Sequence, residues 1–500
     1  MLTMSDDHGR ITVIKLACSR LTSADFGTLR RAQVQAVQRG RSAFLVDLSA
    51  VRRITRSGLA GLVEFQSAAP REVVIGYFGA CPAVAREIDR CALSRLLTVF
   101  ETREAALAAP AFRARRLAGM KAVVLVAGAG RRMAPLSAQT PKPLLDLMGR
   151  PVLEHVMTHL AGFGLRDVLI NPGHLGPQFH ARLSSAGLRP VQFFNEGRYL
   201  GPHWQAAPLG SASTLLAMQA QLSAFDEDFV VMCGDAISTV DLAEMASLHR
   251  RSGADVTLAV QQVPRDAVQN YGILEIDAQA RVTGFVEKPT PKQPPSRLAS
   301  TGIYIFHPRA LRHLAYGAPQ DIAHDLLPAI LAAGGRIQAY QGAFDWCDIG
   351  CPRDYFLANS RALRGLLPQI TPQGREIRRH VWAAPGAVVA PRAVIVGPCF
   401  IGADAVVEAG AKLEGPTVIG AGAHVSSRVL VRRSIVMAQT AVAPGSWVDD
   451  MIVSGDWAVD HRFADGSEQP QEPMEGVNWC GDRPIAAHNR DVTPEWRVAQ

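Results

Sequence analysis

Three features are scarce in this chain of 500 residues: cysteine, long apolar runs, and basic stripes interleaved with aromatic residues. The eight cysteines are scattered, which indicates free thiols in a reducing compartment, so we expect a cytoplasmic protein. No apolar run approaches the roughly 20 residues that a membrane-spanning helix needs. Residues 1–10 carry acidic side chains and no apolar core, so we expect no signal peptide. The net charge of +7 comes without an aromatic-basic stripe, which argues against nucleic-acid binding.

The length predicts several domains, because 500 residues exceed one ordinary hydrophobic core. Hydrophobic residues make up 48% of the chain, which is typical of a globular protein. We expect an α/β domain over residues 1–112, a linker over 113–119, a second α/β domain over 120–365, a repeat domain over 376–455 and a polar tail over 456–500.

The most informative segment is residues 125–143, which read LVAGAGRRMAPLSAQTPKP. The run KAVVL before it predicts a buried parallel strand. Gly128 and Gly130 allow a tight turn that brings bare N–H groups close to phosphate oxygens. Arg132 offers a bidentate anion clamp, and Lys142 offers a mobile point charge. The loop therefore suits a polyphosphate ligand.

Two other phosphate-binding loops do not fit this segment. A dinucleotide-binding fingerprint needs a third small residue where Met133 stands, and Arg131 and Arg132 follow the glycines instead. A Walker loop needs its lysine directly after the last glycine, whereas an irregular, proline-containing stretch separates Lys142 from Gly130.

The segment closely resembles the signature of sugar-phosphate nucleotidyltransferases, a glycine loop followed by Arg, Pro-Leu-Thr and Pro-Lys-Pro. Ser137 stands where that family usually has Thr, and Arg131 where it often has Thr. Later motifs follow in the family's order. The strand-like run DFVVMCGDAI ends near Asp235, and DWCDIGCP contains Asp348; the resemblance implies that these two carboxylates hold Mg²⁺.

Further motifs match the family's substrate pockets. GFVEKP supplies Glu287 and Lys288, and the resemblance implies that they contact the sugar hydroxyls and the sugar's phosphate. STGIYIF supplies Gly302 and Tyr304, in a segment that lines the same pocket. LGSAS, with Gly210, resembles the family's segment beside the nucleotide base.

The resemblance implies a Rossmann-like α/β fold with a mixed, mostly parallel sheet, and transfer of a nucleoside monophosphate from a nucleoside triphosphate to a sugar 1-phosphate. A sugar 1-phosphate is already anionic near neutral pH, so the reaction needs positioning and charge stabilisation more than a general base. Arg132 would hold the β- and γ-phosphates, Lys142 the α-phosphate and Lys288 the sugar phosphate. Anionic substrates would also account for part of the net charge of +7.

Each site residue also has a structural interpretation. Taken alone, Asp235 is typical of a turn or helix cap, Asp348 of a helix cap, and Glu287 of a surface ion pair. The order of five motifs within one half of the chain favours a shared site instead. Cys347 and Cys351 lack the further ligands that a four-ligand metal clip needs.

The motifs do not decide which nucleoside triphosphate and which sugar phosphate the protein uses. The best match is GTP with mannose 1-phosphate, giving GDP-mannose; UTP or dTTP with another sugar phosphate is the alternative. Residues 197–207 form an insert that departs from the family pattern at the rim of the base pocket. A second class is a non-catalytic regulatory subunit, which the intact set of charged residues disfavours.

An internal repeat marks the C-terminal part. Aliphatic residues recur every six positions from Val389 to Met437, and mostly small residues lie four positions after each of the first six. This period predicts a parallel β-helix of about three coils, and it resembles the left-handed hexapeptide-repeat β-helix of many sugar nucleotidyltransferases. Some hexapeptide-repeat proteins use a histidine for acyl transfer, but His424 is the only histidine in the nine hexads. We therefore favour a role of this domain in assembly over acyl transfer. We expect a homo-oligomer.

The N-terminal part reads as a separate unit. ITVIKL, AFLVDLS and REVVIGYFG predict strands, and residues 25–40 predict a helix. The segment LVDLSAVRRITRSGLAGL resembles STAS domains, in which an Asp-Ser pair forms a phosphorylation switch. Thr55 and Arg56 occupy those two positions, so we expect partner docking at residues 55–62 and no phosphate switch. Ser57 is expected to cap the following helix.

Overall fold

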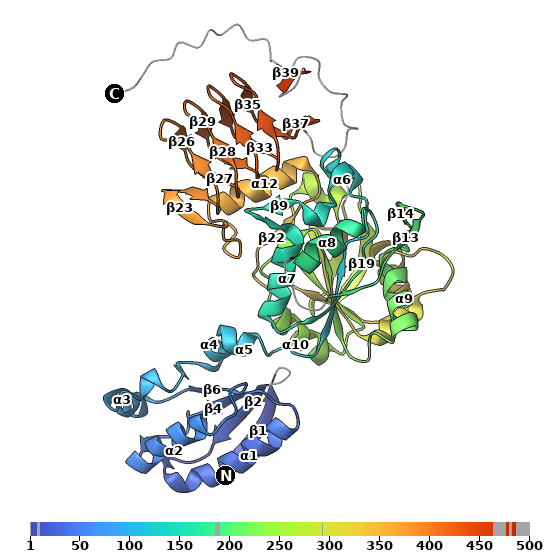
Figure 1. Cartoon of the computed structure of the whole chain (residues 1–500). Helices are drawn as coiled ribbons and strands as arrows, with labels where there is room; N and C mark the ends of the chain where they lie inside the picture. The colour runs from blue at the N-terminus through green and yellow to red at the C-terminus, as the bar shows by residue number, and fades with distance from the viewer. Residues whose placement is uncertain are drawn as a thin grey trace.

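The structure is a computed structural model that describes residues 2–7, 11–185, 191–292, 294–463, 477–479 and 483–486. Three bodies follow one another along the chain: an N-terminal unit, a central α/β domain and a C-terminal stack of short strands (Figure 1). Within the described ranges, no helix combines the length and apolar character needed to cross a membrane.

The N-terminal unit is a five-stranded sheet in the order β1-β2-β4-β6-β7, and only β1 runs antiparallel to its neighbour. The strands are β1 (Leu2–Asp7), β2 (Ile11–Leu16), β4 (Ala43–Asp47), β6 (Val74–Phe78) and β7 (Val99–Phe100). Helices α1 (Phe26–Gln38) and α2 (Arg56–Ser67) cover one face. Helices α4 (Arg103–Ala108) and α5 (Pro110–Arg113) cover the other. The predicted strands and the first predicted helix are confirmed.

One predicted detail of this unit is wrong. The cap of α2 is Thr55, whose Oγ1 accepts a hydrogen bond from Gly58 N at 3.0 Å. Helix α2 already begins at Arg56, so Ser57 lies inside the first turn and has no orphan N–H to cap two positions ahead. Its hydroxyl lies 3.0 Å from Thr55 Oγ1 instead.

The segment 113–119, expected as a linker, is packed against the central domain. Arg116 is only 5% exposed, and its Nη1 lies 3.3 Å from Asp241 Oδ2. The guanidinium of Arg113 lies over the ring of Phe163, 5.6 Å from its centre. Leu117 N donates a hydrogen bond to Phe163 O at 3.0 Å. The chain therefore enters the central domain through an anchored segment.

The central domain is built on a nine-stranded sheet that is mixed but mostly parallel, as predicted. The main path runs β12 (Val191–Phe193), β11 (Asp167–Ile170), β8 (Lys121–Leu125), β15 (Phe229–Cys233), β20 (Leu298–Phe306), β17 (Val256–Gln262) and β21 (Ile337–Tyr340). Strand β20 is antiparallel to both neighbours, and the other pairs on this path are parallel. The hairpin β18 (Gly272–Ile276) and β19 (Val282–Glu287) joins the sheet through β20.

Helices cover both faces of this sheet. Because alternate side chains of a strand point to opposite faces, Val123 packs with one apolar core and Val124 with the other. The first core includes α9 (Ser211–Leu222) and α11 (Leu327–Ala332). The second includes α7 (Val152–Gly162), α8 (Pro177–Ser185) and α10 (Leu242–Ser252). Burial on both faces explains why the strands read as continuous apolar runs.

The C-terminal stack is made of three sheets that the chain visits in turn. The middle strands of the first are β24 (Val381–Ala383), β27 (Cys399–Ile401), β30 (Thr417–Ile419), β33 (Ile435–Val436) and β36 (Met451–Val453). The second holds β25 (Val388–Val389), β28 (Val406–Val407), β31 (His424–Val425) and β34 (Ala441–Val442). The third holds β26 (Val394–Val396), β29 (Lys412–Glu414), β32 (Leu430–Arg432) and β35 (Trp447–Asp449). Every neighbouring pair among these strands is parallel.

The predicted spacing of six fails at its last position. From Ile395 to Val431 the aliphatic positions are buried inside the stack. Ile419 then lies opposite Val436, 17 residues on, whereas Ile401 lies opposite Ile419, 18 residues on. One turn is therefore a residue shorter, so Val436 and not Met437 points inward.

A third apolar core joins the stack to the central domain. Its centre is α12 (Pro352–Leu363), which contributes Tyr355 and Phe356. The stack contributes the outward-facing side chains of one sheet, Phe400, Val418, Ile435 and Ile452.

The first residues of the expected polar tail close this core. Strand β37 (Ala458–Asp460) pairs antiparallel with β36. The His461 ring then stacks on Phe356 at 3.6 Å between ring centres. Most of the predicted tail beyond residue 463 lies outside the described residues, apart from the strands β38 (Val477–Trp479) and β39 (Arg483–Ala486).

Candidate active site

The glycine-rich segment forms an open loop at the carboxyl end of β8. Gly130 has a left-handed φ of 60° and leads into the short 3₁₀ turn Arg131–Met133. A Cβ atom added at Gly128 would meet nothing within 4 Å, so its backbone borders open space where a ligand can approach. Ser137 Oγ donates to Gly130 O at 2.9 Å and fixes the returning chain. Ser137, which stands where the family usually has Thr, therefore also provides a hydroxyl group that binds the loop.

Lys142 and Asp235 form the centre of the site. Lys142 begins the 3₁₀ turn Lys142–Leu144, and its Nζ lies 2.5 Å from Asp235 Oδ2. The lysine side chain is only 10% exposed. Burial lowers the pKa of Lys142, but the carboxylates of Asp235 and Asp348 more than offset this, and the net pKa is raised. Lys142 is therefore held as a cation beside two carboxylates.

Asp348 and Arg132 complete this cluster. Asp348 ends β22 (Trp346–Asp348), which pairs antiparallel with β16 (Ala236–Ser238) and places Asp348 opposite Ala236. Burial raises the pKa of Asp348 to about 6; Asp235 adds to this, while Lys142 and Arg132 oppose it. A Cβ atom at Gly350 would lie 3.3 Å from Asp348 Oδ2 and 3.6 Å from Arg132 Nη2. The structure thus brings Arg132, Lys142, Asp235 and Asp348 together.

Glu287, which ends β19, and Lys288, which follows it, form a pair next to this cluster. Lys288 Nζ is 3.2 Å from Glu287 Oε1, and the lysine side chain is about half exposed. Lys288 N donates to Tyr271 O at 3.0 Å. The Tyr271 ring packs edge-on against Trp346 at 5.1 Å between ring centres, and Trp346 lies two residues before Asp348. The pair is thus connected to β22, the strand that ends at Asp348, through two aromatic rings.

The other predicted residues have separate roles. Gly302, with φ 73°, lies against β15, because a Cβ there would meet Cys233 Sγ at 2.8 Å. Gly210, with φ 91°, precedes α9, and a Cβ there would meet Gln320 O at 2.5 Å. Tyr304 is buried in the first core of the central domain, with its hydroxyl 3.2 Å from Ser300 Oγ. The first two positions therefore exclude larger residues, and Tyr304 is a packing residue.

Glu196 and Asn171 are important residues that sequence reasoning missed. Asn171 follows β11 directly; its Oδ1 accepts from Val126 N at 2.7 Å, and its Nδ2 donates to Glu196 Oε1 at 2.8 Å. The buried Glu196 carboxylate also accepts from Leu209 N at 2.8 Å and from the Thr214 hydroxyl. This network ties the end of β8 to the start of α9. The available signal was Asn171 directly after the apolar run of β11 and Glu196 three residues after that of β12.

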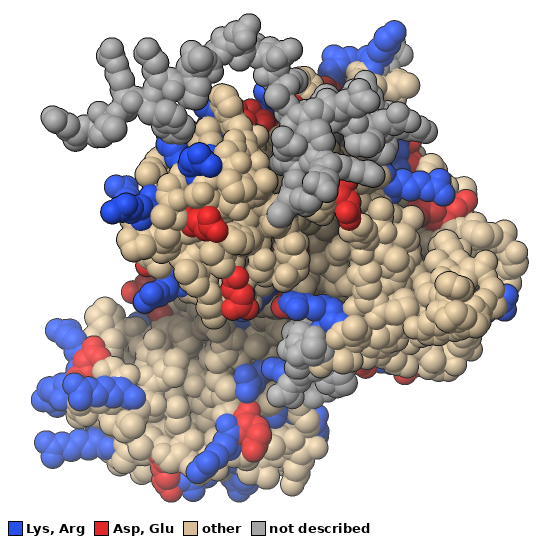
Figure 2. All heavy atoms as spheres, turned by 45° about the horizontal axis from the view of Figure 1, so that its top comes forward, with Lys and Arg blue, Asp and Glu red and all other residues tan. Residues whose placement is uncertain are grey.

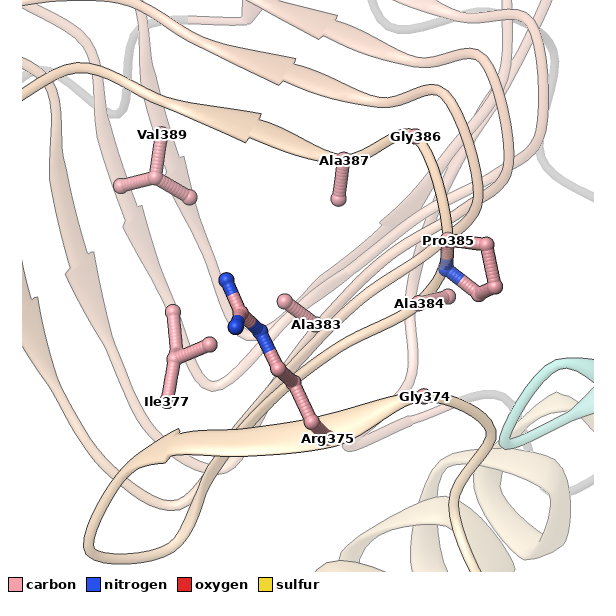
Figure 3. Close-up of a pocket in the computed structure, with 9 residues that line it drawn as sticks. All are labelled: Gly374, Arg375, Ile377, Ala383, Ala384, Pro385, Gly386, Ala387 and Val389. Carbon is pink, nitrogen blue, oxygen red and sulfur yellow. The ribbon is translucent and has the colours of Figure 1, made fainter.

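One hollow in the structure has no reactive chemistry. It lies at the open end of the first coil of the stack, beside β23 (Arg375–Arg378), and measures about 530 Å³. Figure 3 shows the Arg375 side chain extending between small and aliphatic residues such as Ala383 and Val389. Its lining holds no carboxylate, hydroxyl or thiol, so we place the reaction at the cluster around Lys142.

The cluster suits a magnesium ion. Among the described side chains, no group of three or more His, Cys, Asp or Glu residues could hold a metal by itself. Mg²⁺ is commonly bound through only one or two carboxylates together with substrate phosphates. Asp235 and Asp348 fit that requirement, and burial is the main reason that the pKa of Asp348 is raised, with the neighbouring carboxylate of Asp235 adding to it. Cys347 and Cys351 are free thiols whose burial raises their pKa to about 11 and about 12.

Glu196→Gln should destabilise the protein although the two side chains have nearly the same shape. The new amide group would point N–H donors at groups that already donate, which leaves buried donors unsatisfied. We expect a loss of about 2 kcal/mol or more of unfolding free energy, measured as a shift of the central domain's urea transition. Glu227→Gln, at an exposed carboxylate just before β15, is the control and should shift it by less than about 0.5 kcal/mol. Equal shifts would contradict a structural role for Glu196.

Comparisons with known proteins agree with this site. Residues 121–365 match the family described as nucleotidyl transferase. The chain is 32% identical to UTP–glucose-1-phosphate uridylyltransferase of Synechocystis sp. over 350 residues, which covers 69% of this chain and 90% of that protein. It is 30% identical to mannose-1-phosphate guanylyltransferase of Mycobacterium tuberculosis, covering 58% and 77%, and 29% identical to mannose-1-phosphate guanylyltransferase 1 of Arabidopsis thaliana, covering 68% and 88%. The chain therefore belongs to the sugar-1-phosphate nucleotidyltransferases.

Proposed function

We propose that this protein transfers a nucleoside monophosphate from a nucleoside triphosphate to a sugar 1-phosphate and releases pyrophosphate. The observation that carries the proposal is the convergence of two cations, Arg132 and Lys142, with two carboxylates, Asp235 and Asp348, at the carboxyl ends of β8 and β15. Ligands of open α/β sheets bind at that edge. A non-catalytic subunit would have no use for the complete set.

The residues act by binding and orientation. Lys142 would contact the α-phosphate, Arg132 the β- and γ-phosphates, and Glu287 with Lys288 the sugar hydroxyls and phosphate. Holding two polyanions in line supplies much of the rate, because a bimolecular step becomes effectively unimolecular. Mg²⁺, held by Asp235 and Asp348, would supply neutralisation of the phosphate charge. The sugar phosphate is already a nucleophile, so no side chain needs to remove its proton.

GTP and mannose 1-phosphate are our proposed substrates, giving GDP-mannose. The two guanylyltransferase relatives above support this choice, while the uridylyltransferase relative supports UTP with glucose 1-phosphate as the alternative. Gly210, which admits no side chain against Gln320, is the residue proposed beside the base. A panel of four nucleoside triphosphates against several sugar 1-phosphates, read as pyrophosphate release, decides between the two pairs.

Asp235→Ala should lower kcat by about 10²-fold or more. The change removes a proposed magnesium ligand and also leaves the buried Lys142 without its closest partner, and losses of this size follow the removal of one electrostatic stabiliser. Turnover is measured with the best substrate pair and Mg²⁺. Asp226→Ala, at an exposed aspartate three residues before β15, should retain wild-type turnover. Wild-type activity in the Asp235 variant would exclude this assignment.

We also infer finer identities for the two flanking bodies. Three parallel sheets visited in turn, with Val407, Val425 and Val442 stacked in the interior, support a left-handed hexapeptide-repeat β-helix. The mixed N-terminal sheet, with α1, α2 and α3 (Pro82–Arg90) packed on one face, supports a STAS-like domain. The domain boundaries at 112, 120, 365 and 376 are part of this proposal; the first lies inside α5 and the last inside β23. The anchored segment 113–119 lies between the first two bodies.

The β-helix is our proposed site of self-association. Val394, Lys412, Leu430 and Trp447 are aligned by register along one outer column of the third sheet. Val394 is 51% exposed and Trp447 is 60% exposed. Large apolar side chains in one outward-facing column are typical of protein interfaces, and a homo-oligomer would bury them.

Charges in this column should weaken the oligomer. The double variant Val394→Asp with Trp447→Glu should raise the dissociation constant at least about tenfold, which corresponds to about 1.4 kcal/mol. Size-exclusion chromatography with light scattering over a dilution series measures this. Val388→Asp, at an exposed valine on the neighbouring sheet, is the control. A monomeric wild-type chain, or an equal effect of the control, would contradict this interface.

The N-terminal unit is our proposed docking module for an acidic protein partner. Arg20, Arg52, Arg53 and Arg56 are exposed around the start of α2, and Arg20 lies opposite Arg53 where β3 (Arg20–Leu21) pairs with β5 (Arg53–Ile54). In the described part of the chain none of the four forms an ion pair. Figure 2 shows blue side chains projecting around this lower unit with few red ones among them. Such a surface favours a carboxylate-rich partner.

Removing residues 1–112 should leave catalysis nearly intact. The unit has apolar cores of its own on both faces of its sheet, and every proposed substrate contact lies after residue 120. A chain that begins at Arg113 keeps the contacts of Arg113, Arg116 and Leu117 with the central domain. Its kcat/KM should stay within about threefold of the full chain, a barrier change below 1 kcal/mol. A hundredfold loss in a folded protein would show that the unit completes the active site.

A further inference from the structure

A second hollow lies beside the insert that precedes α9. The insert folds into a hairpin of β13 (Gly197–Leu200) and β14 (His203–Ala206), paired antiparallel. Between this hairpin and the start of α8 lies a pocket of about 430 Å³. That volume is within the range of small-molecule sites. Its functional groups are His180, Asn195, Arg198, Tyr199 and Trp204.

The lining combines aromatic faces with hydrogen-bonding groups and a positive charge. The rings of Tyr199 and Trp204 meet edge to face at 5.3 Å between centres, and Tyr199 is 60% exposed, so a ring face is open for stacking. His180 Nε2 bonds to Asn195 Oδ1 at 2.8 Å, which leaves the Asn195 amide N–H groups to serve a ligand. Arg198 is exposed and makes no ion pair within the described residues. A planar ring that carries phosphate fits all three kinds of group.

Trp204 lines this pocket and contacts the segment that leads to the glycine-rich loop. Its Nε1 donates to Gly173 O at 2.7 Å. Cβ atoms at Gly176 and Gly197 would meet the indole ring at 2.6 Å and 2.5 Å, so the ring is wedged between two glycines.

The connection continues from Gly173 to the glycine-rich loop. A Cβ at Gly173 would lie 2.7 Å from Ala127 O, and His174 N donates to the same oxygen at 3.1 Å. Ala127 directly precedes Gly128. A ligand that shifts Trp204 would therefore act, through two contacts, on the loop proposed to hold the triphosphate.

We propose that the hairpin pocket binds a second nucleotide, with its base on Tyr199 and Trp204 and its phosphates on Arg198. Occupancy changes turnover through Trp204, which acts as a positioning residue for the glycine-rich loop. The ligand class is a nucleoside diphosphate group, whose source is either the nucleotide-sugar product or a free nucleotide. The choice of a nucleotide sugar as a ligand and the effect on turnover rest on the proposed function, whereas nucleotide binding in the pocket does not.

Equilibrium titration of the full-length protein tests the site. GDP-mannose, UDP-glucose, GDP and GTP are each titrated by calorimetry without a sugar phosphate. Comparing the two nucleotide sugars with GDP and GTP distinguishes a product ligand from a free nucleotide. The wild type should bind two equivalents of at least one of them. The double variant Arg198→Ala with Tyr199→Ala should lose one equivalent or at least about tenfold in its affinity, the scale of a lost stacking contact. His203→Ala, on the same hairpin but outside the pocket, should bind like the wild type.

Turnover then tests the connection. Trp204→Phe keeps an aromatic ring but removes the hydrogen bond to Gly173, so it should retain both equivalents while losing the effect of added nucleotide on pyrophosphate release. Binding of a single equivalent of nucleotide by the wild type would overturn the proposal. A raised KM for the triphosphate in the double variant would also overturn it, because the pocket would then be part of the substrate site. If pyrophosphate release fails for every substrate pair but the double variant still loses one equivalent, the pocket stands and the proposed reaction falls.

Discussion

The apolar core around α12 is the packing on which the active site depends. Met133 follows the glycine-rich loop, and Cys347 and Ile349 flank Asp348; all three are buried in this core together with Phe400 and Ile435 of the C-terminal stack. Close-packed interiors transmit displacements of even a methyl group, so the positions of the loop and of Asp348 are set partly by strands more than 50 residues later in the chain. The stack is therefore a structural part of the enzyme and not a detachable appendage.

Within that frame, the charges of the site are arranged at the ends of strands. Asp235 follows β15, and Asp348 ends the strand that pairs beside it, so the fold brings two carboxylates together that repel each other at close range. Lys142 offsets part of that repulsion, and its pKa is raised by the two carboxylates although burial lowers it. Burial, with a smaller contribution from Asp235, raises the pKa of Asp348 to about 6. In the proposed function, Mg²⁺ that arrives with a polyphosphate would add the positive charge beside these two carboxylates.

Asp235 and Asp348 were predicted from motifs that resemble those of the nucleotidyltransferases, and Arg132 and Lys142 from the chemistry of the glycine-rich loop. In the structure these four side chains lie close together, although their roles stay predictions. The Glu196 network could not be predicted, because a buried carboxylate is recognised only once its three donors from separate segments are known. The shortened turn before Val436 escaped the pattern for a different reason. Met437 is also apolar, so composition alone does not show which of two adjacent residues points inward.

The distribution of charge changes how the basic character of the chain is explained. Residues 1–112 contain 15 Lys and Arg against 10 Asp and Glu, a net +5 of the total +7. At the active site, by contrast, Arg132 and Lys142 are matched by Asp235 and Asp348. Anionic substrates, predicted to account for part of the surplus, would concern at most the remaining +2, because +5 of the +7 lies in the body that has no proposed substrate contact. Long-range attraction acts where the unpaired charge is, and here that is the arginine-lined edge beside α2 formed by Arg20, Arg52, Arg53 and Arg56.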